Sequence, residues 1–173
     1  MNTLEAISDS SAVSTLMSQP VTFLPRETKV VDALSRAREL RVHHIPIGDA
    51  NAPLGVLCTC DLREAGLSDQ LGDLLSRPAI SIELRASLRE AADAMRTAVV
   101  GSLLVADGAS IVGIVTRSDI VRSLGTQTSL AEVVCFCCGS DQHLKLDEHE
   151  QLLCVDCRER ASEPHSFDEG RGG

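Results

Sequence analysis

The chain has 173 residues, which is enough for one ordinary domain and a small appendage. Its net charge of −9 and its lack of Trp and Tyr speak against a protein that binds nucleic acid through a basic face and stacking aromatic rings. Hydrophobic residues make up 43% and can build a core, yet no stretch approaches the roughly 18–20 apolar residues of a membrane span.

The N-terminal residues 1–12 are polar and acidic. They lack the basic start and apolar run of a secretory signal, so we expect a lead-in to the first domain. The seven cysteines are an odd number, and they fit a reducing compartment better than a disulfide framework. We therefore expect a cytoplasmic protein without a membrane anchor.

Two copies of one unit follow, since the chain matches itself without gaps at a constant offset of 58 residues. Apolar positions agree at this offset as well as identical residues. The identical pairs include Ala33 with Ala91, Gly55 with Gly113, and Asp61 with Asp119. Such a repeat predicts two structurally equivalent halves.

Each copy is predicted to run β-α-β-β-α. In the first copy, an extended piece at 21–24 is followed by a helix at 30–40, strands at 44–47 and 54–58, and a helix that opens at 60–62. The same elements of the second copy fall at 79–82, 88–95, 102–105, 111–115 and 118–120. Two three-stranded units must bury their faces together, which predicts an α/β (α+β layered) fold of pseudo-twofold symmetry.

Two stretches carry a family resemblance. Gly113-Ile-Val-Thr-Arg-Ser-Asp119-Ile120 and His43-His-Ile-Pro-Ile47 resemble signatures of the CBS domain. The pair resembles a tandem of CBS domains, or Bateman module, with copies at 13–66 and 71–125. This resemblance implies a regulatory protein rather than an enzyme. It also implies a homodimer packed through the CBS helices, and an adenine nucleotide (AMP, ADP, ATP or S-adenosylmethionine) bound between the copies.

The resemblance also assigns binding residues. In the second copy, Thr116 fits the hydroxyl that meets phosphate, Asp119 the carboxylate that holds the ribose, and Arg117 could add positive charge. Cys58 replaces the hydroxyl in the first copy, and a thiol is a weak donor, so we expect the second site to be the better one. The base walls of the second site are expected from Ile80, Leu103, Leu104 and Val115, and the first site from Thr22, Ile45, Pro46 and Asp61.

A structural alternative stays open for these residues. Thr116 and Asp119 have the spacing of a helix capping box, in which the aspartate would touch no ligand. On that interpretation the two CBS domains serve only for dimerisation or packing. Cys58 and Cys60, at a strand end, are either small hydrophobic residues or a redox pair.

Two Cys-x-x-Cys pairs follow the second copy, with fifteen residues between them. Such pairs can place four thiolates around one ion, which predicts a tetrahedral Zn²⁺ site, with iron as the alternative. Cys137 could in principle replace a ligand of the first pair. The expected ligands are Cys135, Cys138, Cys154 and Cys157.

We therefore expect a zinc ribbon at 133–160 and a disordered polar tail at 161–173. The interval between the cysteine pairs is acidic, which argues against a ribbon that binds nucleic acid and favours contact with an unidentified protein partner. His143 and His149 lie in this interval and could replace a cysteine as a ligand, although solvated side chains are the expectation. A rubredoxin-like iron protein is the alternative function, although the second pair lacks the Pro and Gly expected of that family.

Overall fold

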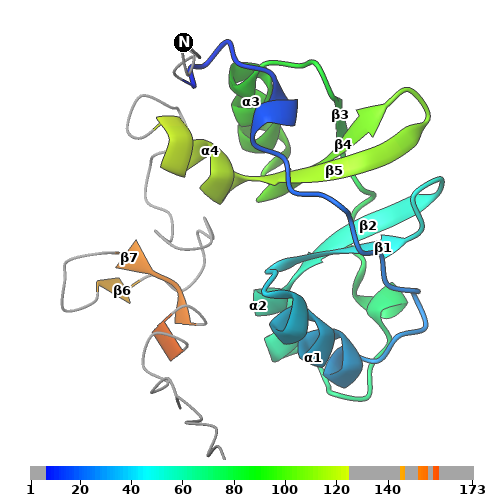
Figure 1. Ribbon diagram of the computed structural model, residues 1–173. Coiled ribbons are helices and arrows are strands. Elements are labelled where there is room, and N and C mark those ends of the chain that lie inside the picture. The colour runs from blue at the N-terminus through cyan, green and yellow to red at the C-terminus, as the bar shows by residue number, and fades with distance from the viewer. Residues whose placement is uncertain (1–6, 125–144, 147–151, 156–157, 160–173) are drawn as a thin grey trace, which may run out of the picture.

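The computed structural model describes residues 7–124, 145–146, 152–155 and 158–159. It has two lobes, one from each copy of the repeat (Figure 1). The first lobe contains α1 (Val30–Leu40), β1 (His44–Gly48), β2 (Pro53–Cys58) and α2 (Thr59–Glu64). The second contains β3 (Ser81–Glu83), α3 (Leu88–Ala98), β4 (Ser102–Asp107), β5 (Ser110–Thr116) and α4 (Arg117–Leu124). The predicted α/β layered fold is confirmed.

The two sheets differ by one strand. In the second lobe, β3 runs parallel to β4, and β4 pairs antiparallel with β5. In the first lobe, β1 and β2 form an antiparallel pair, and the expected first strand is reduced to a bridge between Leu24 and Ile47. The N–H of Leu104 donates to the carbonyl of Ile80 at 2.9 Å. Pro46 occupies the place of Leu104 in the first copy and has no N–H to donate, so this ladder is shorter.

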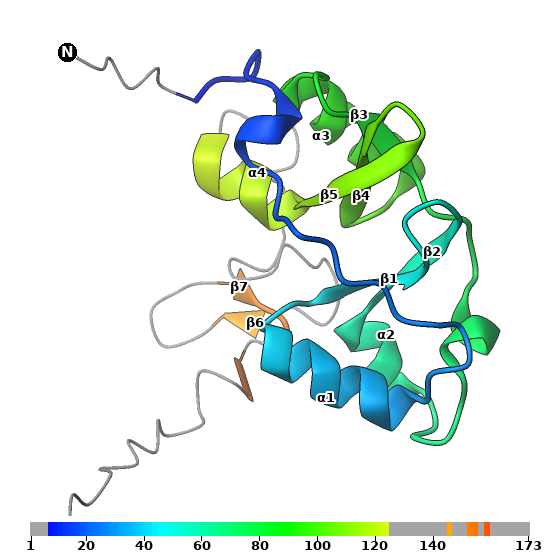
Figure 2. The same ribbon diagram turned by 45° about the vertical axis from the view of Figure 1, so that its right-hand side comes forward.

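Two short 3₁₀ helices cross between the lobes. The first, η1 (Val13–Thr15), opens the first copy but puts fully buried Val13 into the core of the second lobe. The second, η2 (Leu71–Leu74), opens the second copy but puts fully buried Leu71 into the core of the first lobe. In Figure 2 the N-terminal segment runs from beside α3 and α4 down to α1. Each lobe is thus completed by the segment that leads into the other.

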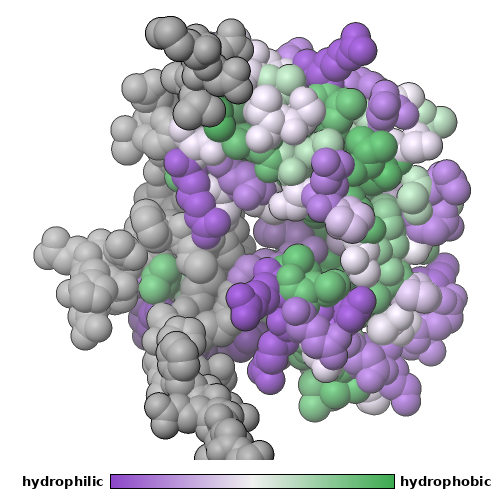
Figure 3. Space-filling view, in the orientation of Figure 1, coloured by the Kyte–Doolittle hydropathy of each residue, from purple (hydrophilic) through white to green (hydrophobic). Residues whose placement is uncertain are grey.

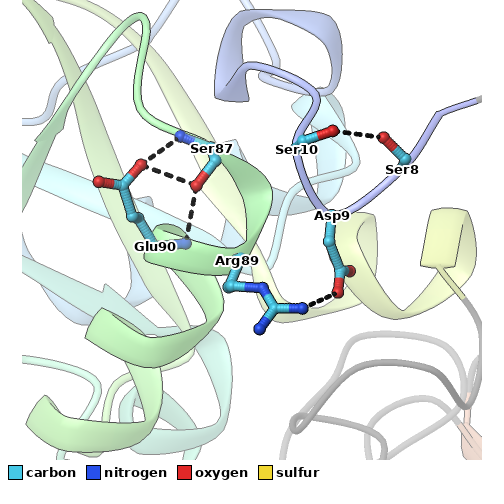
Figure 4. Close-up of polar contacts among 6 residues, drawn as sticks. All are labelled: Ser8, Asp9, Ser10, Ser87, Arg89 and Glu90. Atoms are coloured by element: carbon cyan, nitrogen blue, oxygen red, sulfur yellow. Dashed lines mark hydrogen bonds and ion pairs between the residues drawn. The ribbon is translucent and has the colours of Figure 1, made fainter.

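Polar contacts fix the N-terminal segment to α3 (Figure 4). Arg89 forms an ion pair with Asp9 at 3.1 Å. The helix itself begins with a capping box, because Ser87 and Glu90 bond to each other's backbone N–H. These contacts reinforce the placement of η1 on the second lobe.

Gly55 and Gly113 allow the crossing segments to pass close to β2 and β5. A Cβ on Gly55 would lie 2.5 Å from Cδ2 of Leu75 and 3.1 Å from the carbonyl oxygen of Arg77. A Cβ on Gly113 would lie 2.5 Å from Sδ of Met17. Gly55 and Gly113 therefore allow chain segments of the two copies to pack closely against each other.

We predict that Gly55→Ala lowers the free energy of unfolding by about 1–3 kcal/mol, since the added methyl group overpacks a contact with backbone. Gly113→Ala should cost less, because the three nearest atoms all belong to the flexible side chain of Met17 and none to the backbone. Urea unfolding followed by circular dichroism measures both. Equal losses for the two variants would contradict the role assigned to the Arg77 backbone.

On the face in Figure 3, apolar side chains lie in small patches among polar ones over both lobes. Among the residues that the structure describes, no helix has the length and apolar content needed to cross a membrane.

Candidate functional site

Two cavities lie where the copies meet. The first cavity, of about 420 Å³, is lined by the end of β2 and start of α2 from the first copy, and by residues 74–80, 99–102 and Arg117. The second cavity, of about 210 Å³, is lined by part of residues 18–24, the end of α1, the start of β1, and Ile114 of β5. At the repeat offset, Val56 of the first cavity corresponds to Ile114 of the second, so the two cavities are related by the internal symmetry.

The expected site residues are grouped differently by the structure. Asp61, Ile80 and Arg117 line the first cavity, and Thr22, Ile45 and Pro46 line the second. Ile80 was expected beside Asp119, and Thr22 beside Asp61. The first cavity combines Asp61 of the first copy with Ile80 and Arg117 of the second, whereas the second cavity is lined by the first copy and by Ile114 of the second.

The remaining expected residues line neither cavity. Leu103, Leu104 and Val115 are 0% exposed and belong to the interior of the second lobe. Thr116 and Asp119 are half-buried and bond to each other. The N–H and Oγ1 of Thr116 donate to Oδ2 of Asp119 at 2.8 and 2.6 Å. These two residues therefore form the capping box that the spacing allowed.

The first copy has a weaker version of the same box. The N–H of Cys58 donates to Oδ2 of Asp61 at 3.3 Å, and the N–H of Cys60 donates to Sγ of Cys58 at 3.4 Å. Unlike their counterparts in the second copy, Cys58, Cys60 and Asp61 all line a cavity. In the first copy, the residues that cap α2 therefore also line the cavity.

Arg77 and Arg117 supply positive charge to the first cavity. Nη1 of Arg77 donates to the carbonyls of Ala98 and Val99 at 3.1 and 3.0 Å, at the end of α3. Nε of Arg117 is buried and has no hydrogen-bond partner among the described residues. The backbone N–H of Arg117 donates to the carbonyl of Gly101 at 2.9 Å, which fixes the start of α4 at the cavity.

His44 was not among the expected binding residues, but it lines both cavities. Its ring lies against Gly101, where an added Cβ would come 2.9 Å from Nε2. Burial, followed by the nearby His43 and Arg117, lowers the pKa of His44 from 6.5 to about 4, although Asp119 acts in the opposite direction. The sequence did contain one indication of His44 as a site residue, because it is a titratable residue at the start of a buried strand.

The low pKa of His44 predicts a loss of stability in acid. As pH falls from 6.5 towards about 4, the unfolded chain takes up a proton that the folded His44 does not, so folding becomes less favourable by roughly 1–3 kcal/mol. Urea unfolding of the wild type and of His44→Gln on both sides of this window measures the effect. The variant should lose less stability than the wild type, and an equal loss would contradict the assignment.

The C-terminal segment is described in part. β6 (Lys145–Leu146) pairs antiparallel with β7 (Leu152–Leu153), and Cys154 directly after β7 is 1% exposed. The N–H of Arg158 donates to the carbonyl of Cys154 at 3.1 Å. Arg63 of α2 forms an ion pair with Glu159 at 2.7 Å. The other expected ligands and nearby candidates, Cys135, Cys137, Cys138, His143, His149 and Cys157, lie outside the described residues.

Comparison with solved structures gives matches that cover about two thirds of this chain. The CBS domain of a bacterial CNNM/CorC family Mg²⁺ transporter in complex with ATP is 18% identical, with a TM-score of 0.60 over 67% of this chain and 88% of that chain. A putative acetoin utilization protein (AcuB) from Vibrio cholerae is 30% identical, with a TM-score of 0.55 over 64% of this chain and 87% of that chain. CBSX2 in complex with AMP is 25% identical, with a TM-score of 0.54 over 65% and 94% of the two chains.

No curated protein matches the chain. The model of the CBS domain matches it twice, at residues 13–68 and 71–126, so the two matches together cover more than half of the chain. The chain therefore belongs to the CBS domain family and carries two CBS domains in tandem.

Proposed function

We propose that this chain is a cytoplasmic regulatory protein that binds an adenosine-containing ligand in the first cavity. CBS pairs commonly bind adenine nucleotides in regulatory roles, and the solved relatives include complexes with ATP and with AMP. The observation that carries the proposal is the composition of the cavity. It combines a carboxylate, apolar side chains and arginine in a volume that suits a small molecule.

Each part of the ligand has a suitable partner. The carboxylate of Asp61 can accept from the two ribose hydroxyls. Ile80, Val56 and Val100 line the cavity and offer an apolar wall to the base. This assignment moves the better site from Thr116 and Asp119, as the sequence suggested, to the cavity that contains Asp61.

Isothermal titration with AMP, ATP and S-adenosylmethionine tests the proposal. Asp61→Asn should weaken the binding of the preferred ligand by about 10-fold or more, because it removes a charged acceptor. Asp119→Asn is the matched control, since Asp119 occupies the equivalent position but does not line the first cavity. Undetectable binding of all three compounds at millimolar concentration would reject the proposed function.

We further propose that Cys135, Cys138, Cys154 and Cys157 hold Zn²⁺ in a ribbon that presents a surface to a partner protein. The support is the buried position of Cys154 after the β6–β7 pair and the hydrogen bond that the N–H of Arg158 donates to its carbonyl. The ion would supply folding energy rather than catalysis. The alternative is an iron ion bound by the same four thiolates.

A route from the ligand to this segment runs through α2. Asp61, in the first turn of the helix, lines the first cavity, and Arg63 pairs with Glu159 after β7. A ligand that binds one position of α2 better than another would shift the equilibrium between the two positions.

We also propose a homodimer packed through the CBS helices. Val31 of α1, which is 46% exposed, is a candidate contact between the two protomers. Light scattering on the purified protein should give the mass of two chains, and the mass of one chain would contradict the homodimer.

A further inference from the structure

We infer that Cys58 and Cys60 are a site of reversible thiol oxidation, at which a hydroperoxide converts the two thiols into one disulfide. The inference goes beyond the proposed function, because it concerns a modification of the chain and requires no bound nucleotide. The sequence left this pair open between two small hydrophobic residues and a redox pair, and three observations favour the redox pair.

The first argument is the geometry of the pair. Cys58 is the last residue of β2, and Cys60 lies in the first turn of α2. The N–H of Cys60 donates to Sγ of Cys58 at 3.4 Å, so this sulfur already lies against the backbone of the other cysteine. Two residues span at most about 7 Å even in an extended chain, and here the chain turns into a helix. Since a disulfide joins Cα atoms about 4.4–6.8 Å apart, little backbone movement is needed to connect the two sulfurs.

The second argument is the access of an oxidant to the pair. Both cysteines are half-buried and line the first cavity, of about 420 Å³, which admits a molecule as small as hydrogen peroxide. Arg77 and Arg117 line the same cavity, and positive charge beside a thiol favours the reactive thiolate. Among the described residues that line the cavity, the two arginines outnumber the one carboxylate, that of Asp61. The pair therefore differs from cysteines that are inert because they are packed in a core.

The third argument is the contrast with the second copy. At the repeat offset, Thr116 occupies the place of Cys58, and Ser118 occupies the place of Cys60. The hydroxyl of Thr116 accepts from the N–H of Asp119 at 3.3 Å, so the start of this helix is capped without sulfur. The first copy thus carries thiols at both positions where the same fold is built with hydroxyl groups. Capping alone does not require the two cysteines.

The oxidation balances with hydrogen peroxide as the oxidant. The thiolate of one cysteine attacks a peroxide oxygen, the O–O bond breaks, and a sulfenic acid and one water are formed. The sulfur of the other cysteine then attacks the sulfenic sulfur, which forms the S–S bond and releases a second water. The two thiols together lose two electrons and two protons, and the peroxide takes up both. A dithiol reverses the step by thiol–disulfide exchange, and in a reducing compartment such a transient bond suits a sensor.

Oxidation should change the start of α2. Sγ of Cys58 accepts from the N–H of Cys60, and the N–H of Cys58 donates to Oδ2 of Asp61 at 3.3 Å. A disulfide draws Sγ of Cys58 towards the sulfur of Cys60 and away from this N–H. Hydrogen exchange in the first turn of α2 should therefore increase by about 2- to 30-fold, the range expected for the loss of a helix cap. The exchange of α4, which Thr116 caps, should not change.

The experiment treats the full chain with a small excess of hydrogen peroxide, blocks the remaining thiols with iodoacetamide and digests the product with trypsin. The tryptic peptide 42–63 contains Cys58, Cys60 and no other cysteine, because cleavage occurs after Arg41 and Arg63. By mass spectrometry this peptide should carry no alkyl group and should lack two hydrogen atoms. Dithiothreitol before the blocking step should restore both thiols. Cys58→Thr and Cys60→Ser, which introduce the residues of the second copy, should each abolish this product.

The outcomes are independent of nucleotide binding, so the proposed function can fail while this inference stands. Oxidation confined to the cysteines beyond residue 134, with peptide 42–63 fully alkylated, would overturn the inference. A disulfide that joins Cys58 or Cys60 to a different cysteine would also overturn it, as would a sulfinic acid formed on one of them without a disulfide. An unchanged exchange of α2 in the oxidised chain would contradict the link between the modification and the helix cap.

Discussion

Replacing Leu71 by alanine should destabilise the protein by about 3–5 kcal/mol, the range for a large-to-small change at a fully buried leucine. Leu71 is 0% exposed and packs with Val30, Leu62 and other residues of the first lobe's core. Its N–H donates to the carbonyl of Thr28 at 2.9 Å, so the backbone of η2 is held and cannot easily move to fill the space. The substituted residue opens the second copy, yet the core that loses packing belongs to the first lobe.

Urea unfolding followed by circular dichroism measures this loss, and hydrogen exchange identifies the lobe that opens. Leu67→Ala is the matched control, because Leu67 is 59% exposed in the same connection and should change stability by less than about 0.5 kcal/mol. Exchange that increases first in α3 and β4, rather than in α1 and β1, would contradict the crossed arrangement.

Periodicity and the repeat offset predicted the elements of both copies. The two strand pairs and four main helices lie within a few residues of the predicted ranges, because apolar spacing follows from burial within one element. The loss of a first strand in the first lobe could have been read from Pro46, which has no N–H at a position where the second copy donates.

The crossing of η1 and η2 could not be predicted in the same way. Val13 and Leu71 match each other at the repeat offset, but the offset shows only that they are equivalent, not which core each of them enters. The grouping of site residues depends on that choice. The sequence therefore identified Asp61, Ile80 and Arg117 as candidates but assigned Asp61 to the first site and the other two to the second, whereas the structure places all three around one cavity.

The capping box illustrates a second limit. The same spacing of a hydroxyl or thiol and an aspartate occurs in both copies, and both form the local contacts that the spacing allows. Exposure to a cavity distinguishes them, and it depends on segments far away in the sequence. Local chemistry alone favoured Thr116 over Cys58, although the cavity lies beside Cys58.

Removal of the proposed zinc ion should unfold the proposed C-terminal ribbon and leave the two CBS domains folded. A segment of this size builds little core, and a structural ion contributes on the order of 10 kcal/mol to folding when four thiolates bind it. Purified protein should contain one zinc per chain by elemental analysis. Cys154→Ser should lose it, because Cys154 is buried at the end of β7 and its thiolate would be one of the four ligands.

Limited proteolysis after treatment with a chelator reads out the structural effect, with cleavage expected beyond α4 and a protected fragment containing both lobes. Cys60→Ser is the matched control, because Cys60 lines the first cavity and is not one of the four proposed ligands. A coloured protein that contains iron would support the alternative metal, and full zinc content in Cys154→Ser would remove Cys154 from the ligand set. If the ion pair between Arg63 and Glu159 couples the two parts, chelation should also change the exchange of α2, whereas α4 should remain unaffected.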